Sequence, residues 1–201
     1  MPKNEQDLHL LYGQCYVIIG GKTMRVFYRL VRGEFRTRRE KVESRTKVLR
    51  ELLESLGQDP ATPVERDGLG RLHFPDKSSL DLSLSHAGPF TAYAVGEVRV
   101  GIDLEDPLRV RHPERIAARF FTEAERAFVA SAEDPCAAVC LIWTKKEALA
   151  KYLGKGLAAT YRSCTFSPPV DVEFYSRAVE VDGRLFSLSI CVPAGTEICE
   201  K

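Results

Sequence analysis

The 201-residue sequence lacks a long apolar run, a paired cysteine motif and a strong excess of either charge. No uninterrupted apolar stretch approaches the roughly 18 residues that a membrane-spanning helix requires. No charged segment followed by an apolar one opens the chain, so a secretory leader is not expected and we predict a cytoplasmic location. With 44% hydrophobic and 28% charged residues, the composition is that of an ordinary globular protein.

The six cysteines form neither a metal-binding nor a disulfide pattern. Cys136 and Cys140 lie one helical turn apart, but no histidine or second cysteine pair near them completes a zinc site. A chain of this length can bury a core without disulfides. We therefore expect buried, reduced thiols.

The net charge of +1 conceals an uneven distribution of charge. Residues 1–50 contain 12 Lys and Arg against 5 Asp and Glu, which is a local excess of seven positive charges. Such a segment would attract an anionic ligand or an acidic partner. The alternative is a solvated basic helix face.

Apolar periodicity predicts an α+β protein, in which strands, one helix, further strands, three helices and final strands follow one another. The expected helices are residues 38–56, 113–120, 122–131 and 135–153. The expected strands are residues 12–19, 23–31, 80–84, 91–95, 98–104, 170–175, 178–181 and 185–192. This order is compatible with two similar halves that meet near residues 96–101.

Local signals mark the ends of several elements. Gly20-Gly21 and Asp182-Gly183 suit hairpin turns. Thr122 and Glu125 have the spacing of a capping box, and Gly57 and Gly154 are suited to end helices.

Two acidic residues in one strand are candidates for metal binding. Asp103 and Glu105 are separated by two positions, so both side chains leave the same face of the strand, and Pro107 suggests that they lie near its rim. Carboxylates this close repel each other unless a cation or a proton lies between them, and an oxygen-only site suits Mg²⁺. The alternative is a pair of solvated acids at the end of a strand.

The helix at 135–153 carries a second group of candidates. Trp143, Glu147 and Lys151 follow one another at intervals of one turn. One interpretation is an ordinary salt bridge between Glu147 and Lys151 beside a core tryptophan. The other makes Glu147 a metal ligand or base and Lys151 a phosphate-binding residue, with Lys155 in reach of the same phosphate region.

A histidine follows the strand at 80–84, in the sequence Ser85-His86-Ala87-Gly88. A single histidine at such a junction is more often structural than catalytic. At the mouth of a phosphate site it would instead donate a hydrogen bond to an anionic oxygen.

The order of these motifs resembles the signature of the 4′-phosphopantetheinyl transferases. The matching residues are Ser85-His86, then Gly101-Ile102-Asp103-Leu104-Glu105, then Trp143-x-x-Lys146-Glu147-x-x-x-Lys151. His86 and Asp103 are 17 residues apart, and Asp103 and Glu147 are 44 apart. The resemblance covers about residues 71–156 and is to the longer, surfactin-synthetase-activator type, whose single chain holds two similar subdomains.

The resemblance implies an enzyme that moves the 4′-phosphopantetheine arm of coenzyme A onto a serine of an apo acyl or peptidyl carrier protein, releasing 3′,5′-ADP. It implies two pseudo-symmetric subdomains, residues 1–98 and 99–201, with the active site between them. It also implies dependence on Mg²⁺ and a monomer. We expect neither a nucleic acid nor a membrane as a partner.

The resemblance also assigns roles to single residues. Asp103, Glu105 and Glu147 would hold Mg²⁺, Glu147 would be the base toward the serine hydroxyl, directly or through water, and Lys151 would hold the pyrophosphate. The implied coenzyme A contacts are Arg45, Thr46, Arg71, Ser85, His86, Lys151 and Lys155. Two departures are evident, because Ala87 stands where many relatives have serine and Leu72, rather than proline, follows Arg71.

Two other classes of function compete with this interpretation. A non-catalytic module that binds coenzyme A or a nucleotide would be expected to lose one of the acids or the lysine, and all are present. A nucleic-acid-binding domain would use the basic helix, but its basic residues are interleaved with Glu34, Glu40 and Glu43, and no recognition motif accompanies it.

Overall fold

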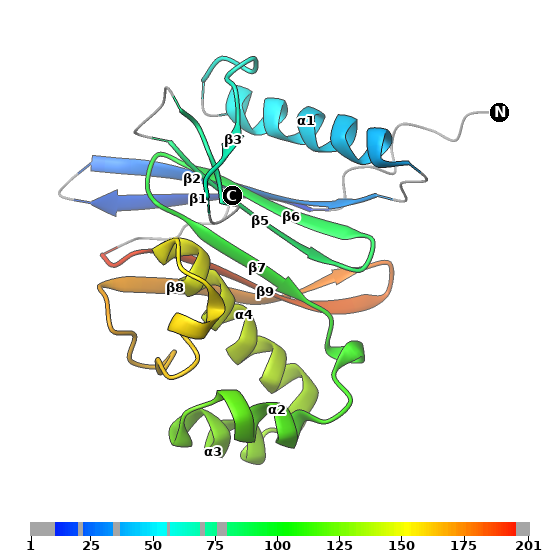
Figure 1. The fold of residues 1–201 in the computed structure, drawn as a ribbon, viewed down its shortest axis with the longest axis vertical. Coiled ribbons are helices and arrows are strands. Elements are labelled where there is room, and N and C mark those ends of the chain that lie inside the picture. Colours follow the sequence, from blue (N-terminus) through cyan, green and yellow to red (C-terminus); the bar gives the residue numbers. More distant parts are fainter. Residues whose placement is uncertain are drawn as a thin grey trace.

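The computed structural model of the chain describes residues 11–19, 22–33, 37–55, 57–68, 71–75 and 80–195. Within these residues two antiparallel sheets stack face to face, and helices cover their outer faces (Figure 1). The predicted α+β class, with small antiparallel sheets packed against helices, is therefore confirmed.

The first sheet has the strand order β1-β2-β6-β5. Its strands are β1 (Leu11–Ile19), β2 (Lys22–Arg32), β5 (Asp81–Ala87) and β6 (Phe90–Gly96). The hairpin predicted for β1 and β2 is confirmed, with Ile19 opposite Lys22, while Gly20 and Gly21 lie outside the described residues. Helix α1 (Arg38–Ser55) covers the outer face of this sheet, and Gly57 follows it with a positive φ of 69° (Figure 1).

The second sheet has the order β7-β9-β8, from β7 (Gly101–Glu105), β8 (Val172–Val181) and β9 (Arg184–Pro193). Asp182 and Gly183 form the predicted turn, with φ of 52° and 71°. The prediction of two short strands at 170–175 and 178–181 is wrong, because β8 is one continuous strand. Ser176, which interrupts the apolar pattern, is paired within the sheet, its Oγ lying 2.9 Å from Oγ of Ser189.

Three helices follow β7, and their predicted positions are confirmed. They are α2 (Pro113–Phe120), α3 (Glu123–Ser131) and α4 (Pro135–Leu153). Thr122 and Glu125 form the complete capping box at the start of α3, and Gly154 ends α4 with a left-handed φ of 67°. The shorter elements are β3 (Glu65–Arg66), β4 (Leu72–His73), and the 3-10 turns η2 (Pro107–Arg109) and η3 (Leu157–Ala159).

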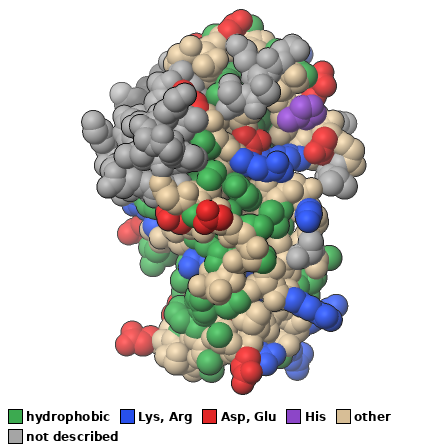
Figure 2. Space-filling view, turned by 90° about the vertical axis from the view of Figure 1, so that its left-hand side faces the viewer, with side chains coloured by type: hydrophobic (Ala, Val, Ile, Leu, Met, Phe, Trp, Pro, Cys, Tyr) green, Lys and Arg blue, Asp and Glu red, His purple; other side chains and the backbone are tan. Residues whose placement is uncertain are grey.

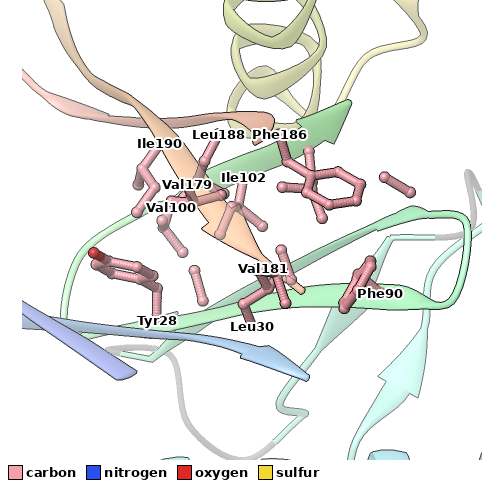
Figure 3. Close-up of a cluster of buried hydrophobic side chains, with 14 of the residues drawn as sticks. Tyr28, Leu30, Phe90, Val100, Ile102, Val179, Val181, Phe186, Leu188 and Ile190 are labelled. Atoms are coloured by element: carbon pink, nitrogen blue, oxygen red, sulfur yellow. The ribbon is translucent and has the colours of Figure 1, made fainter. Parts of the chain in front are cut away.

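The largest core cluster lies between the two sheets and contains side chains from both (Figure 3). Phe90 of β6 meets Phe186 of β9 edge to face, with ring centroids 4.8 Å apart. A second cluster lies between α1 and the first sheet, where Leu52 and Leu53 are buried. Val42, an apolar residue nearer the start of the same helix, is 52% exposed, because the packed stretch of α1 begins only at Val48.

The two halves differ in their elements. The first sheet has four strands and packs against α1, whereas the second has three strands and is followed by η2 and α2–α4, so the predicted pseudo-two-fold symmetry is not established. Four cysteines of the described residues are free thiols; Cys140 and Cys191 are buried, as expected, whereas Cys136 and Cys164 are only half-buried. Among the described residues no helix combines the length and the apolar character that a membrane crossing demands.

Candidate functional site

Polar side chains join the two sheets along strands β5 and β7. Asp81, Ser83 and Ser85 alternate along β5, so they point from one face of that strand. Oδ2 of Asp81 accepts the backbone N–H of Val100 at 2.8 Å, and Oγ of Ser83 accepts that of Ile102 at 3.0 Å. These hydrogen bonds fix the position of β7 relative to β5, and therefore the position of the acids that β7 carries.

A glycine allows α4 to lie directly against β7. A Cβ atom on Gly101 would stand 2.0 Å from the carbonyl oxygen of Ala148 and 2.7 Å from the backbone nitrogen of Tyr152. Both are backbone atoms, so they cannot move aside cheaply. Glycine at this position therefore permits the approach that brings the last turns of α4 over the acidic strand.

Asp103 is 3% exposed, so the prediction that it lies near an open rim is wrong. Its Oδ1 accepts hydrogen bonds from Oγ of Ser85 at 2.5 Å and from Nζ of Lys151 at 2.7 Å. Its Oδ2 is buried and has no hydrogen-bond partner. Burial raises the pKa of Asp103, while Lys151 and Ser85 oppose that rise. An orphaned carboxylate oxygen of this kind favours a cation.

The negative charge of the buried Asp103 carboxylate acts on both Glu105 and Glu147. Burial, with the negative charges of Asp103 and Glu147, raises the pKa of Glu105 to about 7. Burial and the charge of Asp103 raise the pKa of Glu147, and Lys151 partly offsets the effect. The three predicted acids thus lie near enough to repel one another. They do not yet form a complete ligand set, because no group of three Asp, Glu, His or Cys within the described ranges is arranged to hold a metal ion.

Lys151 pairs with Asp103 of β7, and not with Glu147 one turn earlier in α4 as the salt-bridge interpretation expects. Its ammonium group pairs with Asp103, 48 residues earlier, and also donates to the carbonyl oxygen of Ile102 at 2.9 Å. In the part of the chain that the structure describes, Glu147 makes no hydrogen bond or ion pair. Its carboxylate is therefore available to a ligand.

The basic helix α1 contributes a second pair of candidates. Arg45 Nη2 lies 2.5 Å from Nε2 of His86, so the structure joins two residues that were predicted to contact coenzyme A. Thr46 is exposed on the same helix, where its hydroxyl donates to the carbonyl oxygen of Val42 at 3.0 Å. Ser85 differs from these residues, because its hydroxyl proton is already donated to Asp103.

A cavity of about 300 Å³ lies beside Lys151, between β5, the segment around β3 and β4, and the end of α4. Its basic wall contains Arg66, Arg71, Lys151 and Lys155, and its apolar wall includes Leu82. In the view of Figure 2, basic side chains lie beside acidic ones where the upper and lower parts of the molecule meet. No motif marks Arg66, which lies between the helix predicted at 38–56 and the strand predicted at 80–84.

Arg71 lies at this cavity, but its guanidinium group is largely engaged within the protein. It donates to Oδ2 of Asp81, to the carbonyl oxygen of Val100 at 3.1 Å and to the carbonyl oxygen of Lys151. Asp81 also had no predicted role. Its alternation with Ser83 and Ser85 was the available signal, because three polar residues on one face of a strand need partners.

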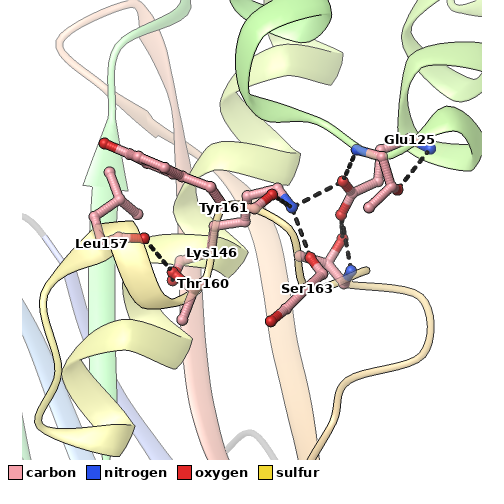
Figure 4. A network of polar contacts seen from close by, with 8 residues as sticks. Glu125, Lys146, Leu157, Thr160, Tyr161 and Ser163 are labelled. Atoms are coloured by element: carbon pink, nitrogen blue, oxygen red, sulfur yellow. Dashed lines mark hydrogen bonds and ion pairs between the residues drawn. The ribbon is translucent and has the colours of Figure 1, made fainter.

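Lys146, the other lysine of the α4 motif, points away from the acids. Lys146 and Glu125 are both fully buried, and Nζ lies 2.8 Å from Oε2 (Figure 4). Nζ also donates to the carbonyl oxygens of Tyr161 and Ser163, at 3.1 and 2.7 Å. This pair therefore attaches the segment after α4 to α3 and α4. Trp143 packs edge to face on Phe120, with centroids 5.4 Å apart, as the interpretation as a core tryptophan expects.

The fold and the site together define a protein of two stacked sheets that gathers three acids near Lys151, a residue that also lines a basic cavity. Residues 99–191 match the model of the 4′-phosphopantetheinyl transferase superfamily. This segment begins just before β7 and contains Asp103, Glu105, Glu147 and Lys151. The match indicates phosphopantetheine transfer as the general class of chemistry. A search of curated proteins finds no match to the chain.

Proposed function

We propose that this protein transfers the 4′-phosphopantetheine arm of coenzyme A to a serine of an apo acyl or peptidyl carrier protein. The observation that carries the proposal is that Lys151, which lines the basic cavity, pairs with Asp103, whose charge also acts on Glu105 and Glu147, within the segment that matches the superfamily. We further propose the single-chain surfactin-synthetase-activator type, acting as a monomer with subdomains 1–98 and 99–201.

Coenzyme A would bind along the junction of the two sheets. The cavity volume is at the lower end of the range for ligand pockets, so it suits the nucleotide end better than the whole molecule. Lys155 and Arg66 would meet its phosphates, as would Arg45, Thr46 and His86 from the other side. A direct contact of Arg71 or Ser85 with phosphate has less support, because the N–H and O–H groups of these residues already donate within the protein.

The residues present fit a magnesium ion. The candidate ligands are all carboxylate oxygens, Asp103 has a buried oxygen without a partner, and Glu147 is unpaired within the described residues. Mg²⁺ usually takes only one or two carboxylates and completes its shell with water and phosphate oxygens, so three converging acids are not required. Bound there, the ion would neutralise the pyrophosphate and the charge that develops on the leaving oxygen.

The proposed chemistry needs one proton transfer and one exchange of bonds at phosphorus. The serine oxygen bonds to the phosphorus that carries the pantetheine arm, and the bond from that phosphorus to 3′,5′-ADP breaks. Glu147 would take the serine proton, directly or through water, and its raised pKa suits that role. Lys151 would hold the pyrophosphate in line with the incoming oxygen.

The basic character of residues 1–50 suits the proposed partner. Carrier proteins of this class are acidic around the modified serine, so an excess of seven positive charges would steer their approach. Which carrier is modified, whether of fatty-acid, polyketide or peptide synthesis, is a question for the assay.

The test is incubation of the protein with coenzyme A, Mg²⁺ and a panel of apo carrier proteins, followed by mass spectrometry of the carriers. We expect the mass of at least one carrier to increase by that of the arm. Glu147→Gln should abolish the increase, while Glu133→Gln, at an exposed acid outside the site, should not. Coenzyme A binding without transfer to any carrier would support the non-catalytic module instead, and near-normal transfer by Glu147→Gln would refute its assigned role.

A further inference from the structure

We propose that Arg71 and Asp81 form a clamp that positions Lys151, and that Arg71 acts through this lysine and not by binding coenzyme A. The expected effect on kcat rests on the proposed function, whereas the contacts of Arg71 and Asp81 do not depend on that function. The clamp crosses the junction between the two sheets. It joins β5 and the loop that follows β3 to β7 and α4.

The loop after β3 first fixes the backbone of Arg71. Oδ1 of Asp67 accepts the backbone N–H of Arg71 at 2.9 Å, and the backbone N–H of Asp67 donates to the carbonyl oxygen of Arg71 at 2.9 Å. The two residues therefore close the loop at its base. Because its backbone is held in place, Arg71 starts its side chain from a fixed position next to β4.

The guanidinium group lies where four elements meet. The side chains of Arg71 and Asp81 are only 14% and 19% exposed, and they form an ion pair. Oδ2 of Asp81 also accepts the N–H of Val100 at 2.8 Å, while Arg71 donates to the carbonyl oxygen of the same residue at 3.1 Å. Both polar groups of the Val100 backbone are thus held by the pair. A planar fork of five N–H groups can make these bonds together, whereas a lysine ammonium cannot reproduce that geometry.

The clamp reaches Lys151 through its backbone. Arg71 donates to the carbonyl oxygen of Lys151 in the last turn of α4, where a positive charge is also favoured by the helix dipole. The other end of Lys151 is held by Asp103, at 2.7 Å. The carbonyl oxygen of Lys151, which also accepts the N–H of Gly154 at 3.1 Å, and its ammonium group are therefore each held by a side chain from outside α4.

Arg99 provides a matched control. It donates to the carbonyl oxygen of Tyr152, the next residue of the same helix turn, and its guanidinium carbon lies 5.9 Å from the centre of the Tyr152 ring. Arg99 therefore places a similar charge at the same helix end. These contacts of Arg99 involve neither Asp81 nor Lys151, so loss of Arg99 should not release the lysine.

The kinetic test compares Asp81→Asn, Arg71→Lys and Arg99→Ala, all in the full-length protein. Because misplacement of a positioned group slows the chemical step, we expect the first two variants to lower kcat by about 10- to 100-fold. Their KM for coenzyme A should change little, since no substrate contact is lost. Arg99→Ala should keep kcat within about twofold of the parent protein. A raised KM in Arg71→Lys with normal kinetics in Asp81→Asn would mean that Arg71 binds coenzyme A directly, and would overturn the proposal.

A second measurement needs no catalytic activity. The rate at which an amine reagent modifies Lys151 in the substrate-free protein can be followed by mass spectrometry, with the exposed Lys155 as internal control. The clamp predicts faster modification of Lys151 in Asp81→Asn and Arg71→Lys, and unchanged modification of Lys155 in both. An unchanged rate at Lys151 would overturn the clamp. If the reagent modifies Lys151 faster in the two variants but the parent protein transfers no arm to any carrier, the clamp would stand and the proposed function would fail.

Discussion

The ammonium group of Lys151 lies 2.7 Å from Oδ1 of Asp103, which joins the last turn of α4 to strand β7. Asp103 is almost completely buried, and Lys151 is partly open to solvent, with 28% of its side chain exposed. The pair therefore places a positive charge at the edge of the cavity while it compensates a negative charge inside the protein. Stability and the proposed binding of coenzyme A would therefore depend on the same contact.

Replacement of Lys151 by methionine should destabilise the fold by about 2–3 kcal/mol, because it leaves a buried carboxylate without its cation. The loss should be larger at pH 8 than at pH 5. Without the ammonium the pKa of Asp103 rises further, so in acid the carboxyl takes up a proton and its burial becomes less costly. Urea unfolding followed by circular dichroism measures both values, and Lys155→Met is the exposed control. Equal losses at the two pH values would contradict this account of the pair.

Glu105 should make the protein less stable as the pH rises. Its pKa in the folded state is about 7, above the ordinary 4.5, so between these values the folded protein binds more protons than the unfolded chain. The stability associated with the protonated group is present below pH 4.5 and is lost as the pH rises to 7. Glu105→Gln should therefore stabilise the protein at pH 8 by about 1–2 kcal/mol, after allowance for screening at this half-buried site, and have no effect at pH 4.

Thermal unfolding at the two pH values tests this prediction. Glu133→Gln is a suitable control, because this acid is exposed and should change stability by less than about 0.5 kcal/mol. Stabilisation by Glu105→Gln of the same size at pH 4 and pH 8 would show that charge is not the cause.

The sequence was sufficient to predict those features that depend on local patterns. Helix α4 begins at Pro135 and ends before Gly154 as expected, and the capping box at Thr122 is confirmed, because short-range steric and hydrogen-bonding rules determine such ends. The same-face placement of Asp103 and Glu105 follows from strand geometry in the same way.

Features that depend on contacts between distant segments could not be predicted. Lys146 and Glu147 are neighbours in one motif, yet Lys146 is buried against Glu125, 21 positions earlier in the chain, while Glu147 lies near Asp103. Local sequence does not say which lysine of the motif reaches which acid. The burial of Asp103 likewise depends on how β5 packs beside β7, and neither strand determines that alone.

Gly101→Ala should be strongly destabilising, by about 3 kcal/mol or more, because the new methyl group would meet two backbone atoms of α4 well inside contact distance. Gly156→Ala is the matched control, since a Cβ atom there meets nothing within 4 Å and the residue has a negative φ. Urea unfolding of both variants gives the comparison. Similar stabilities for the two would contradict the close packing of α4 on β7.

The buried pair of Glu125 and Lys146 should be among the strongest polar contributors to stability. Lys146→Met leaves Glu125 charged and fully buried, so it should cost about 3–5 kcal/mol. The double variant Glu125→Leu/Lys146→Met should lose less than the sum of its single variants, because no uncompensated charge remains. The exposed pair of Arg39 and Glu43 is the control. Although its atoms are 2.7 Å apart, Arg39→Ala should cost less than about 1 kcal/mol.

The pH dependence separates this charge effect from a simple loss of packing. Burial alone would raise the pKa of Glu125, but the hydrogen bonds from Lys146 and from the backbone of Thr122 and Thr165, with the charge of Lys146, outweigh it and lower the pKa. The contribution of the pair is therefore complete above the ordinary pKa of a glutamate and is lost as the pH falls through the lowered value. Without Lys146 the burial of Glu125 raises its pKa, so the difference in unfolding free energy between the parent protein and Lys146→Met should be largest near pH 8 and shrink as the pH falls. A difference that stays constant down to pH 3 would assign the loss to packing around the lysine stem and not to its charge.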